Sequence, residues 1–417
     1  MRFPLFLRGV VIAALGGALL LPLWLIQNKV TERRQRADQV QTTFAAEAGG
    51  VQVVAGPFLV VGSQVLTPRR LEAKGDLAVE QRFRGIFPIR LYRGALEFTG
   101  EFDWPEEALK AGERAYLVLS ISDPRGIKET GNVEAGKLRA RFAPGARGIA
   151  TRSGLHASLG AAEELRKAGP LAFRFALDVT GTTRFDIAPV GDNNQITLAS
   201  KWRHPSLVGA YLSDERKISS EGFSASWRIN QFATGGAAYW REFAASGQPF
   251  SEARLVGVSL IEPVNIYSLS FRAIEYGFLF VLFTFGALAL VETVSDVTLH
   301  SMQYLFVGLA LAVFFLLLLA LSEHIRFATA YVCAAAACVS LLTYYLRHPL
   351  KSFGRTTAFA ALFGGLYGAL YLLLKSEDHA MLLGSILVFV ALATAMILTR
   401  RLDWNALSRR LAPQPSA

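Results

Sequence analysis

The sequence predicts an α+β membrane protein with an N-terminal transmembrane anchor, an antiparallel β-rich, sandwich-like outer domain and a C-terminal bundle of five transmembrane helices. Hydrophobic residues make up 52% of the 417 residues, which is more than a soluble protein of this length normally carries. The long apolar runs lie near both ends of the chain. The segment between them alternates apolar and polar residues, as β-strands do.

Six apolar runs approach or exceed the roughly 20 residues that a helix needs to cross a bilayer core. They are residues 5–26, 274–291, 302–321, 327–346, 357–374 and 381–398. The first run ends without a small-residue cleavage site, so we expect an uncleaved anchor and not a signal peptide. The predicted divisions are the anchor at 1–28, the β-rich domain at 29–272, the helical bundle at 273–400 and a cytoplasmic tail at 401–417.

Lysine and arginine in the short loops predict the orientation, because cytoplasmic loops carry an excess of these residues. One side carries Arg347, Lys351, Arg355, Arg400, Arg401, Arg409 and Arg410, whereas the alternate loops supply Arg326 and Lys375. Both termini are therefore expected in the cytoplasm, with the large domain outside. The basic residues just after the first run oppose this orientation, but long domains translocate largely regardless of charge.

The sequence "SEHIR", residues 322–326, separates two apolar runs. We predict that it forms the outer turn of a helical hairpin, because charged residues are costly at the bilayer centre and tolerated at the interface. A second interpretation makes Glu323 and His324 a proton or cation relay facing the interior of the bundle. The sequence alone leaves both interpretations open.

Strand patterns dominate the outer domain and are clearest at residues 92–102, 171–179 and 222–230. In each segment the apolar residues occupy alternate positions, which is the period of a half-buried strand. The sequences "SDPRGI" and "PVGDNNQ" are typical of turns between strands. One short polar helix is expected at residues 161–168. Strands of this kind pack as an antiparallel sheet or sandwich.

The outer domain is mildly basic. Residues 27–272 contain 32 Lys and Arg against 26 Asp and Glu, without long runs of one sign. This distribution is not a nucleic-acid-binding stripe, and it suits a surface close to anionic lipid or cell-wall polymer. Both cysteines, Cys333 and Cys338, lie in one apolar run and face different directions on a helix, so we expect no disulfide between them.

No signature of catalysis or cofactor binding is present in the sequence. It lacks HExxH, GxSxG, P-loop, GxGxxG and paired CxxC patterns, so no enzyme activity and no cofactor is predicted. In "SKWRHPSLVG", Trp202, Arg203 and His204 end a strand, where they either bind a glycan or peptide or plug the core. The functional candidates are Glu323, His324, Trp202 and His204.

Three stretches resemble the CreD family of bacterial inner-membrane proteins. They are "APVGDNNQITLASKWRHPSLVGAYLSDERKISSEGFSASW", "EPVNIYSLSFRAIEYGFLFVLFTFGALALVE" and "HSMQYLFVGLALAVFFLLLLALSEHIRFATAY". The resemblance implies a Gram-negative inner-membrane protein with a large periplasmic domain. It also implies a link to cell envelope integrity, to regulation by a two-component system and to altered tolerance of colicins and β-lactams. It supplies no catalytic residue and no substrate.

Three functional classes follow. We favour a structural or regulatory envelope factor whose periplasmic domain contacts envelope proteins or cell-wall polymer while its helices contact the lipid bilayer. A transporter of a lipid, ion or small solute is the first alternative, but such proteins have polar or broken helices near the bilayer midplane. A membrane enzyme acting on envelope polymers is the second alternative, and it requires convergent titratable groups in a pocket.

Overall fold

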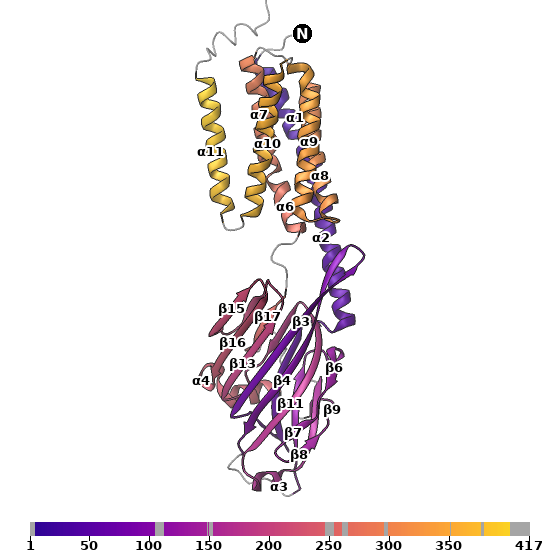
Figure 1. The fold of residues 1–417 in the computed structure, drawn as a ribbon, viewed down its shortest axis with the longest axis vertical. Helices are drawn as coiled ribbons and strands as arrows, with labels where there is room; N and C mark the ends of the chain where they lie inside the picture. Colours follow the sequence, from indigo (N-terminus) through magenta and orange to yellow (C-terminus); the bar gives the residue numbers. More distant parts are fainter. Residues whose placement is uncertain are drawn as a thin grey trace, which may run out of the picture. The chain divides into compact units, whose positions relative to one another are not determined.

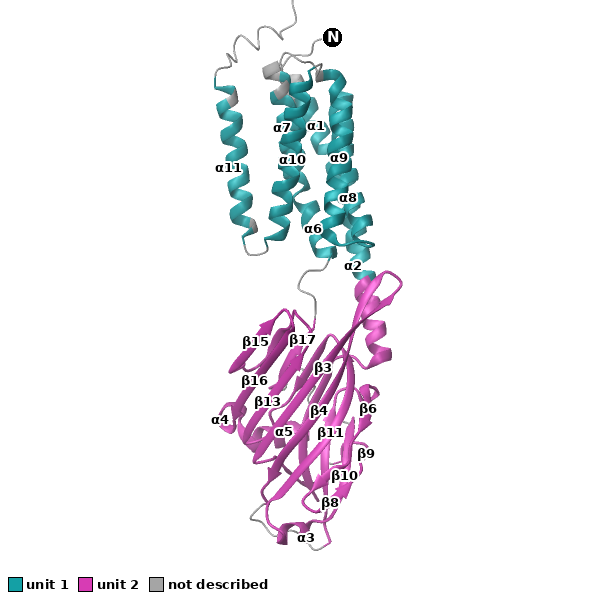
Figure 2. Ribbon diagram, viewed as in Figure 1, with its two compact units in different colours: residues 1–36, 264–417 teal, residues 37–263 magenta. Residues whose placement is uncertain are grey.

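A computed structural model describes residues 5–104, 112–147, 149, 153–246, 254–260, 266–295, 299–350, 352–376 and 379–400. The chain divides into two compact units, which Figure 2 draws in different colours. We call Met1–Arg36 with Val264–Ala417 the helical unit, and Ala37–Pro263 the β-rich unit. The predicted tail at 401–417 lies outside the described residues.

The helical unit contains apolar helices from both ends of the chain (Figure 1). They are α1 (Leu5–Ala18), α2 (Leu20–Ala48), α6 (Ile266–Glu275), α7 (Gly277–Ser295), α8 (Ser301–Ser322), α9 (Phe327–Leu350), α10 (Phe353–Lys375) and α11 (Ala380–Thr399). Helix α2 continues past Arg36 into the β-rich unit. The two compact units divide at Arg36, within this helix. The anchor at 1–28 stays a prediction.

Within the described residues, four helical segments are long and apolar enough to cross a membrane: Val10–Ala48, Ser301–Ser322, Phe327–Pro349 and Phe353–Lys375. A fifth arises if α6 and α7, which are bent by 42° at their junction, form one span. The apolar stretch of α11, Met381–Ile397, is shorter. Each of the six predicted runs is thus largely helical, while the number of spans stays a prediction.

The N-terminal helices pack inside the helical unit. Leu19 and Leu23 are buried, and a Cβ atom added at Gly308 of α8 would lie 2.0 Å from Leu19 Cδ1. A larger residue at this position would displace the Leu19 side chain, so glycine allows the close approach, as small residues do where membrane helices pack closely. The N-terminal segment therefore packs against α8 within the helical unit.

Two sheets build the β-rich unit. Sheet A contains, in spatial order, β14 (Ser206–Gly209), β17 (Val256–Ser259), β12 (Arg184–Ile187), β1 (Gln52–Val61), β5 (Arg114–Ile121), β10 (Gly154–Ala161) and β9 (Ala143–Pro144), with β2 (Gln64–Leu66) paired to β1. Sheet B contains β15 (Glu215–Ser219), β16 (Gly222–Asn230), β13 (Asn193–Ser200), β3 (Arg70–Arg84), β4 (Phe87–Phe102), β11 (Leu171–Thr182), β7 (Val133–Ala135) and β8 (Leu138–Ala140), with β6 (Ile127–Thr130) paired to β11.

Residues of both sheets share one hydrophobic core, as a sandwich requires. The predicted strand faces are confirmed. The apolar positions of β4, β11 and β16 are buried, with Phe98, Leu177 and Trp227 at 1% exposure or less. A helix, α5 (Gly236–Ser246), adds buried Trp240 and Phe243 to the same core.

The prediction of purely antiparallel sheets is wrong. Strand β1 pairs with β12 in parallel, and β13 pairs with β3 in parallel, so both sheets are mixed. The alternation of apolar residues specifies which face of a strand is buried, but it contains no information on the direction of the neighbouring strand. The predicted helix at 161–168 is present as α3 (Ala162–Lys167), whereas α5 was not predicted.

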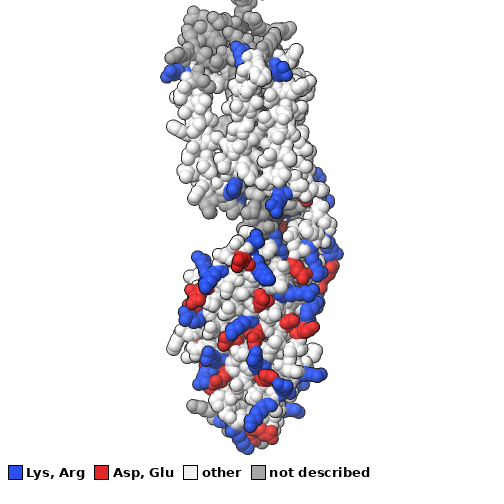
Figure 3. Space-filling model, viewed as in Figure 1, with Lys and Arg blue, Asp and Glu red and all other residues white. Residues whose placement is uncertain are grey.

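Charge is distributed differently in the two units. On the visible face of the β-rich unit, acidic and basic side chains are intermingled, whereas the visible face of the helical unit is almost entirely uncharged (Figure 3). This contrast agrees with an apolar unit solvated by lipid and a polar unit solvated by water.

Candidate functional site

Glu323 lies at the C-terminal end of α8, in the turn that precedes α9. The turn itself is therefore confirmed. Its carboxylate is not open to solvent, because the side chain is only 8% exposed. This position also lies at the negative end of the helix dipole, where a cationic partner is favourable. A buried charge in such a place needs a partner.

Arg33 of α2 is that partner, with its Nε atom 3.6 Å from Glu323 Oε1. The sequence of α2 explains why the arginine points toward α8. Leu23, Ile26 and Val30 are the buried residues of this helix, and Arg33 continues the same three- and four-residue spacing. The buried stripe of α2 thus ends in a cation, whose side chain is 42% exposed.

Tyr267 of α6 completes the group. Its hydroxyl donates a long hydrogen bond of 3.4 Å to Glu323 Oε1, and the residue is 4% exposed. We call Arg33, Tyr267 and Glu323 the ion-pair cluster. It joins α2, α6 and α8 at one end of the helical unit, where it neutralises a buried carboxylate and fixes the helix ends to one another.

His324 is adjacent in sequence but does not join the cluster. Its ring is exposed, and Nδ1 lies 3.1 Å from the Ala320 carbonyl oxygen. The structure therefore separates the two residues of the relay hypothesis: the Glu323 carboxylate points into the helix junction, while the imidazole stays on the surface.

A second carboxylate–tyrosine pair lies at the other end of α8. Tyr304 donates a hydrogen bond of 3.0 Å to Glu292 Oε2 of α7. The nineteen residues from Tyr304 to Glu323 correspond to about 28 Å along a helix, close to the roughly 30 Å of a bilayer core. The two pairs are therefore separated along α8 by about the thickness of a bilayer core.

The layer between these pairs is apolar and aromatic. The rings of Phe280 and Phe314 each lie 4.6 Å from the ring of Tyr367, and the Tyr331 hydroxyl donates to the Tyr367 carbonyl at 2.6 Å. Residues 301–322 contain no Asp, Glu, Lys or Arg. A proton or ion pathway through a membrane normally uses such residues, so α8 offers no relay between its two ends.

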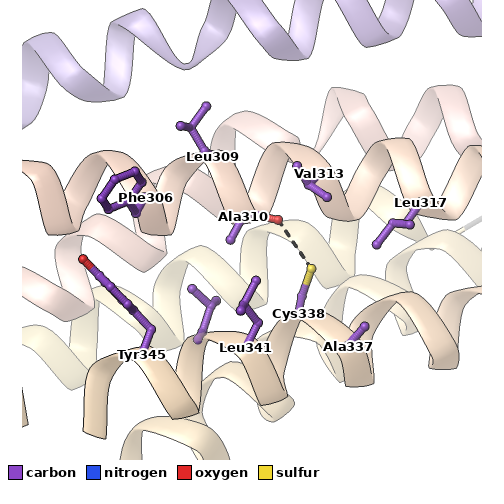
Figure 4. Close-up of a pocket in the computed structure, with 10 residues that line it drawn as sticks. Phe306, Leu309, Ala310, Val313, Leu317, Ala337, Cys338, Leu341 and Tyr345 are labelled. Carbon is purple, nitrogen blue, oxygen red and sulfur yellow. Dashed lines mark hydrogen bonds between the residues drawn. The ribbon is translucent and has the colours of Figure 1, made fainter. Parts of the chain in front are cut away.

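An apolar groove of about 330 Å³ lies between α8 and α9 (Figure 4). Its lining is Phe306, Leu309, Ala310, Val313, Leu317, Ala337, Cys338, Leu341, Leu342 and Tyr345. The one hydrogen bond drawn in it runs from Cys338 Sγ to the Ala310 carbonyl at 3.4 Å. Such a groove can take a hydrocarbon chain, but its lining contains no charged side chain for orienting a charged substrate.

Trp202 and His204 lie together in the β-rich unit, in the loop after β13. Trp202 Nε1 donates to the His204 carbonyl at 3.0 Å, and the two rings are 6.3 Å apart. The guanidinium of Arg90, on β4, lies 5.0 Å from the centre of the Trp202 ring. Trp202 is half-buried against the core, whereas His204 is exposed.

Asp186 of β12 is a buried charge that was not predicted from the sequence. The residue is 1% exposed, and its Oδ2 atom lies 2.7 Å from Arg184 Nε. Burial raises the pKa of the Asp186 carboxyl, and the Arg184 guanidinium opposes that rise. An aspartate between the apolar neighbours Phe185 and Ile187 was the available signal. Within the described part of the chain, no group of three His, Cys, Asp or Glu side chains could hold a metal ion.

Comparison with solved structures gives only distant similarity. An M1 zinc metallopeptidase from Deinococcus radiodurans bound to a Tyr-Ser-Ala substrate is 12% identical, with a TM-score of 0.23, over 39% of each chain. The same enzyme in another structure is 10% identical, with a TM-score of 0.20, over 39% of this chain and 38% of the other. At this level the similarity carries no functional argument.

Comparison of sequences is far more specific. Inner membrane protein CreD of Escherichia coli (strain K12) is 31% identical over 441 aligned positions, which cover 98% of this chain and 95% of that protein. The family described as "Inner membrane protein CreD" matches residues 4–405. The chain therefore belongs to the CreD family of inner membrane proteins.

Proposed function

We propose that this protein is a non-enzymatic factor of the cell envelope whose β-rich unit acts in the periplasm while its helices hold it in the inner membrane. The role in envelope integrity and stress response belongs to this proposal. The excess of basic residues in the short loops supports the periplasmic position. Envelope proteins or cell-wall polymer are the proposed partners of the β-rich unit.

The ion-pair cluster is the observation that carries this proposal. Helix α2 is continuous from the apolar N-terminal segment into the β-rich unit, and Arg33 fixes this helix to α6 and α8 through Glu323 and Tyr267. These contacts suit a protein whose helices hold an outer domain at the membrane. The titratable side chains of a relay would instead continue into the apolar layer, and α8 contains none there.

A second candidate, the handling of a lipid, is favoured by one observation, the apolar groove between α8 and α9. Val313 lines this groove and is 47% exposed, so a larger side chain there fills the groove without entering the core. The variant Val313→Trp thus separates the two candidates.

The experiment is complementation of a strain that lacks its own CreD-family protein, with envelope sensitivity and membrane abundance measured together. We expect the full chain and Val313→Trp to complement equally, and residues 264–417 expressed alone not to complement. Loss of complementation by Val313→Trp at normal abundance would support lipid handling and contradict the anchor proposal. Complementation by residues 264–417 alone would contradict it as well.

A further inference from the structure

Both chain connections of the β-rich unit leave from the same end. Strand β1 begins at Gln52, soon after α2 ends, and Gln52 is paired with Phe185. Arg184, which precedes Phe185 in β12, is paired with Ser259, the last residue of β17. The β-rich unit ends four residues later, at Pro263. Strand registers alone thus place the entry and the exit beside each other. We call this the tethered end.

Two segments of sheet B reach the tethered end. Ser206 at the start of β14 is paired with Ser259, so the loop 201–205 that precedes β14 lies there. Strand β13, which leads into this loop, is parallel to β3, so the far end of β3 and its hairpin with β4 point the same way. The stacking of Arg90 on Trp202 confirms that the two segments meet.

The two segments have an unusual composition. Residues 81–90, "QRFRGIFPIR", contain three arginines and no acidic residue, and residues 201–205, "KWRHP", add a lysine, an arginine and a histidine. Between the arginines of the hairpin, Phe83 is 68% exposed and Ile86 is 36% exposed. Exposed apolar side chains flanked by cations are typical of surfaces that enter a headgroup layer.

Acidic neighbours compensate only part of this charge. Arg82 lies 3.3 Å from Glu80, and Arg84 lies 3.1 Å from Glu47 of α2. All four side chains are 45% exposed or more, so these pairs are weak and exchangeable. The arginines can therefore bind phosphate groups without a large loss elsewhere.

We propose that the tethered end of the β-rich unit binds the surface of the anionic bilayer in which the protein is anchored. Phe83 and Ile86 enter the headgroup region, and Arg82, Arg84 and Arg203 bind lipid phosphates. Trp202, half-buried and stacked with Arg90, stiffens the base of this surface. This lipid contact goes beyond the proposed envelope role. It does not depend on which partner the rest of the β-rich unit binds.

Connectivity favours lipid over a protein or polymer partner. The chain enters the unit from α2 and leaves it toward α6, and both helices belong to the membrane-crossing part of an inner membrane protein. Ile266, the first residue of α6, follows only seven positions after Ser259, the last residue of β17 at this end, so this end stays close along the chain to the apolar helices. Anionic lipid matches a surface of this kind, because its phosphates attract arginine and its headgroup layer accepts an exposed phenylalanine.

The opposite end of sheet B offers a matched control. The hairpin of β7 and β8 carries Leu138, which is 41% exposed, between Lys137 and Arg139. Ala135 of β7 is paired with Phe173, near the start of β11. The tethered end lies at the opposite end of β11, where Thr182 is paired with Leu91 of β4. Leu138 therefore resembles Phe83 in exposure and basic flanks but lies far from the tethered end.

The test uses the purified full-length protein in nanodiscs, with photoreactive benzoylphenylalanine replacing either Phe83 or Leu138. After illumination, mass spectrometry counts lipid adducts in phosphatidylcholine discs and in discs containing phosphatidylglycerol. We expect adducts at position 83 and not at position 138, with more in the anionic discs. Adducts at neither position, or equally at both, would overturn the proposal, and absence of lipid adducts would point to a protein or polymer partner.

Charge variants test the electrostatic part. The double substitution R82E/R84E should lower the adduct yield at position 83 at least about tenfold, because each basic residue near an anionic surface adds appreciably to binding. The charge-conserving R82K/R84K should retain it, and K137E/R139E should not change it. Unchanged yield in R82E/R84E would overturn the proposal. Equal resistance of all variants to chymotrypsin, whose cleavage sites these charge substitutions leave intact, shows that they are folded.

Discussion

Arg33 and Glu323 form an ion pair whose two members differ sharply in exposure. The arginine side chain is 42% exposed, whereas the glutamate side chain is 8% exposed. Removal of Arg33 therefore has a different consequence from removal of Glu323. Without Glu323, the cation can turn to water or lipid headgroups; without Arg33, a carboxylate remains buried at the negative end of α8, with Tyr267 as its hydrogen-bond donor.

The first prediction follows from this asymmetry. Arg33→Ala should lower the free energy of unfolding by about 2 kcal/mol, and Glu323→Gln by less than about 1 kcal/mol, because an amide still accepts from Tyr267. Thermal unfolding of the detergent-solubilised protein, together with membrane abundance, measures the difference. Equal destabilisation by the two variants would contradict the buried position of Glu323. The reversed pair R33E/E323R should recover part of the loss.

Orientation gives the second prediction. The basic residues in the short loops predict that both termini lie inside, so a periplasmic alkaline phosphatase reporter should be active when fused after Ser376 and inactive when fused after Lys351. A cytoplasmic fluorescent reporter at the same two positions should give the inverse pattern and controls for expression. Activity after Lys351 with silence after Ser376 would reject the six-span arrangement.

The β-rich unit should fold alone. Residues 37–263 have their own core, shared by two sheets and α5, and their strand pairs lie within the unit. We therefore expect the excised unit to be soluble, β-rich by circular dichroism and cooperative in its thermal transition. A mainly helical spectrum, or a gradual transition, would show that the unit depends on the helices for its fold.

Tyr92 gives a fourth prediction, measured on the same unit. It is fully buried on β4, and its hydroxyl donates a hydrogen bond of 3.0 Å to the Arg184 carbonyl, which links sheet B to sheet A. Tyr92→Phe keeps the ring and removes the donor, so the unfolding free energy should fall by about 1 kcal/mol. No change would mean that the hydrogen bond contributes nothing net, and loss of the cooperative transition would mean that the link holds the sheets together.

Much of this fold follows from local patterns in the sequence. Apolar runs identified the helices, and alternation identified the buried faces of β4, β11 and β16, because burial depends on residues close in sequence. The parallel pairing of β1 with β12 joins residues that are more than a hundred positions apart. No local period contains that information, which is why the sheets were predicted to be antiparallel.

The candidate site was predictable only in part. The turn at "SEHIR" follows from hydropathy, but the partner of Glu323 does not, since Arg33 lies on a helix at the other end of the chain. Hydropathy treats Arg33 as one of several basic residues after the first run. Only the stripe of Leu23, Ile26 and Val30 distinguishes it from Arg34 and Arg36, and that stripe has meaning once the packing of α2 is known.

The last prediction concerns pH and Asp186. Burial raises the pKa of this carboxyl above its ordinary value of 3.8, so the folded state takes up a proton at a higher pH than the unfolded state does. This group therefore makes the unit more stable as the pH falls through the folded pKa, and the gain is complete below about 3.8. Above the folded pKa, the ionised carboxylate costs stability, although Arg184 at 2.7 Å reduces that cost.

Asp186→Asn should therefore be more stable relative to the parent unit at pH 7.5 than at pH 4.5. Asparagine has nearly the same shape, which matters because a Cβ atom at Gly257 would already lie 2.1 Å from Asp186 Oδ1, and it resembles the protonated acid. Chemical denaturation of both proteins between pH 4.5 and 7.5 gives the difference in their free energies of unfolding. The contributions of the other titratable groups, which both proteins share, cancel in this difference. A difference that is constant with pH, or that grows in favour of aspartate as the pH rises, would show that the ion pair with Arg184 outweighs the cost of burial.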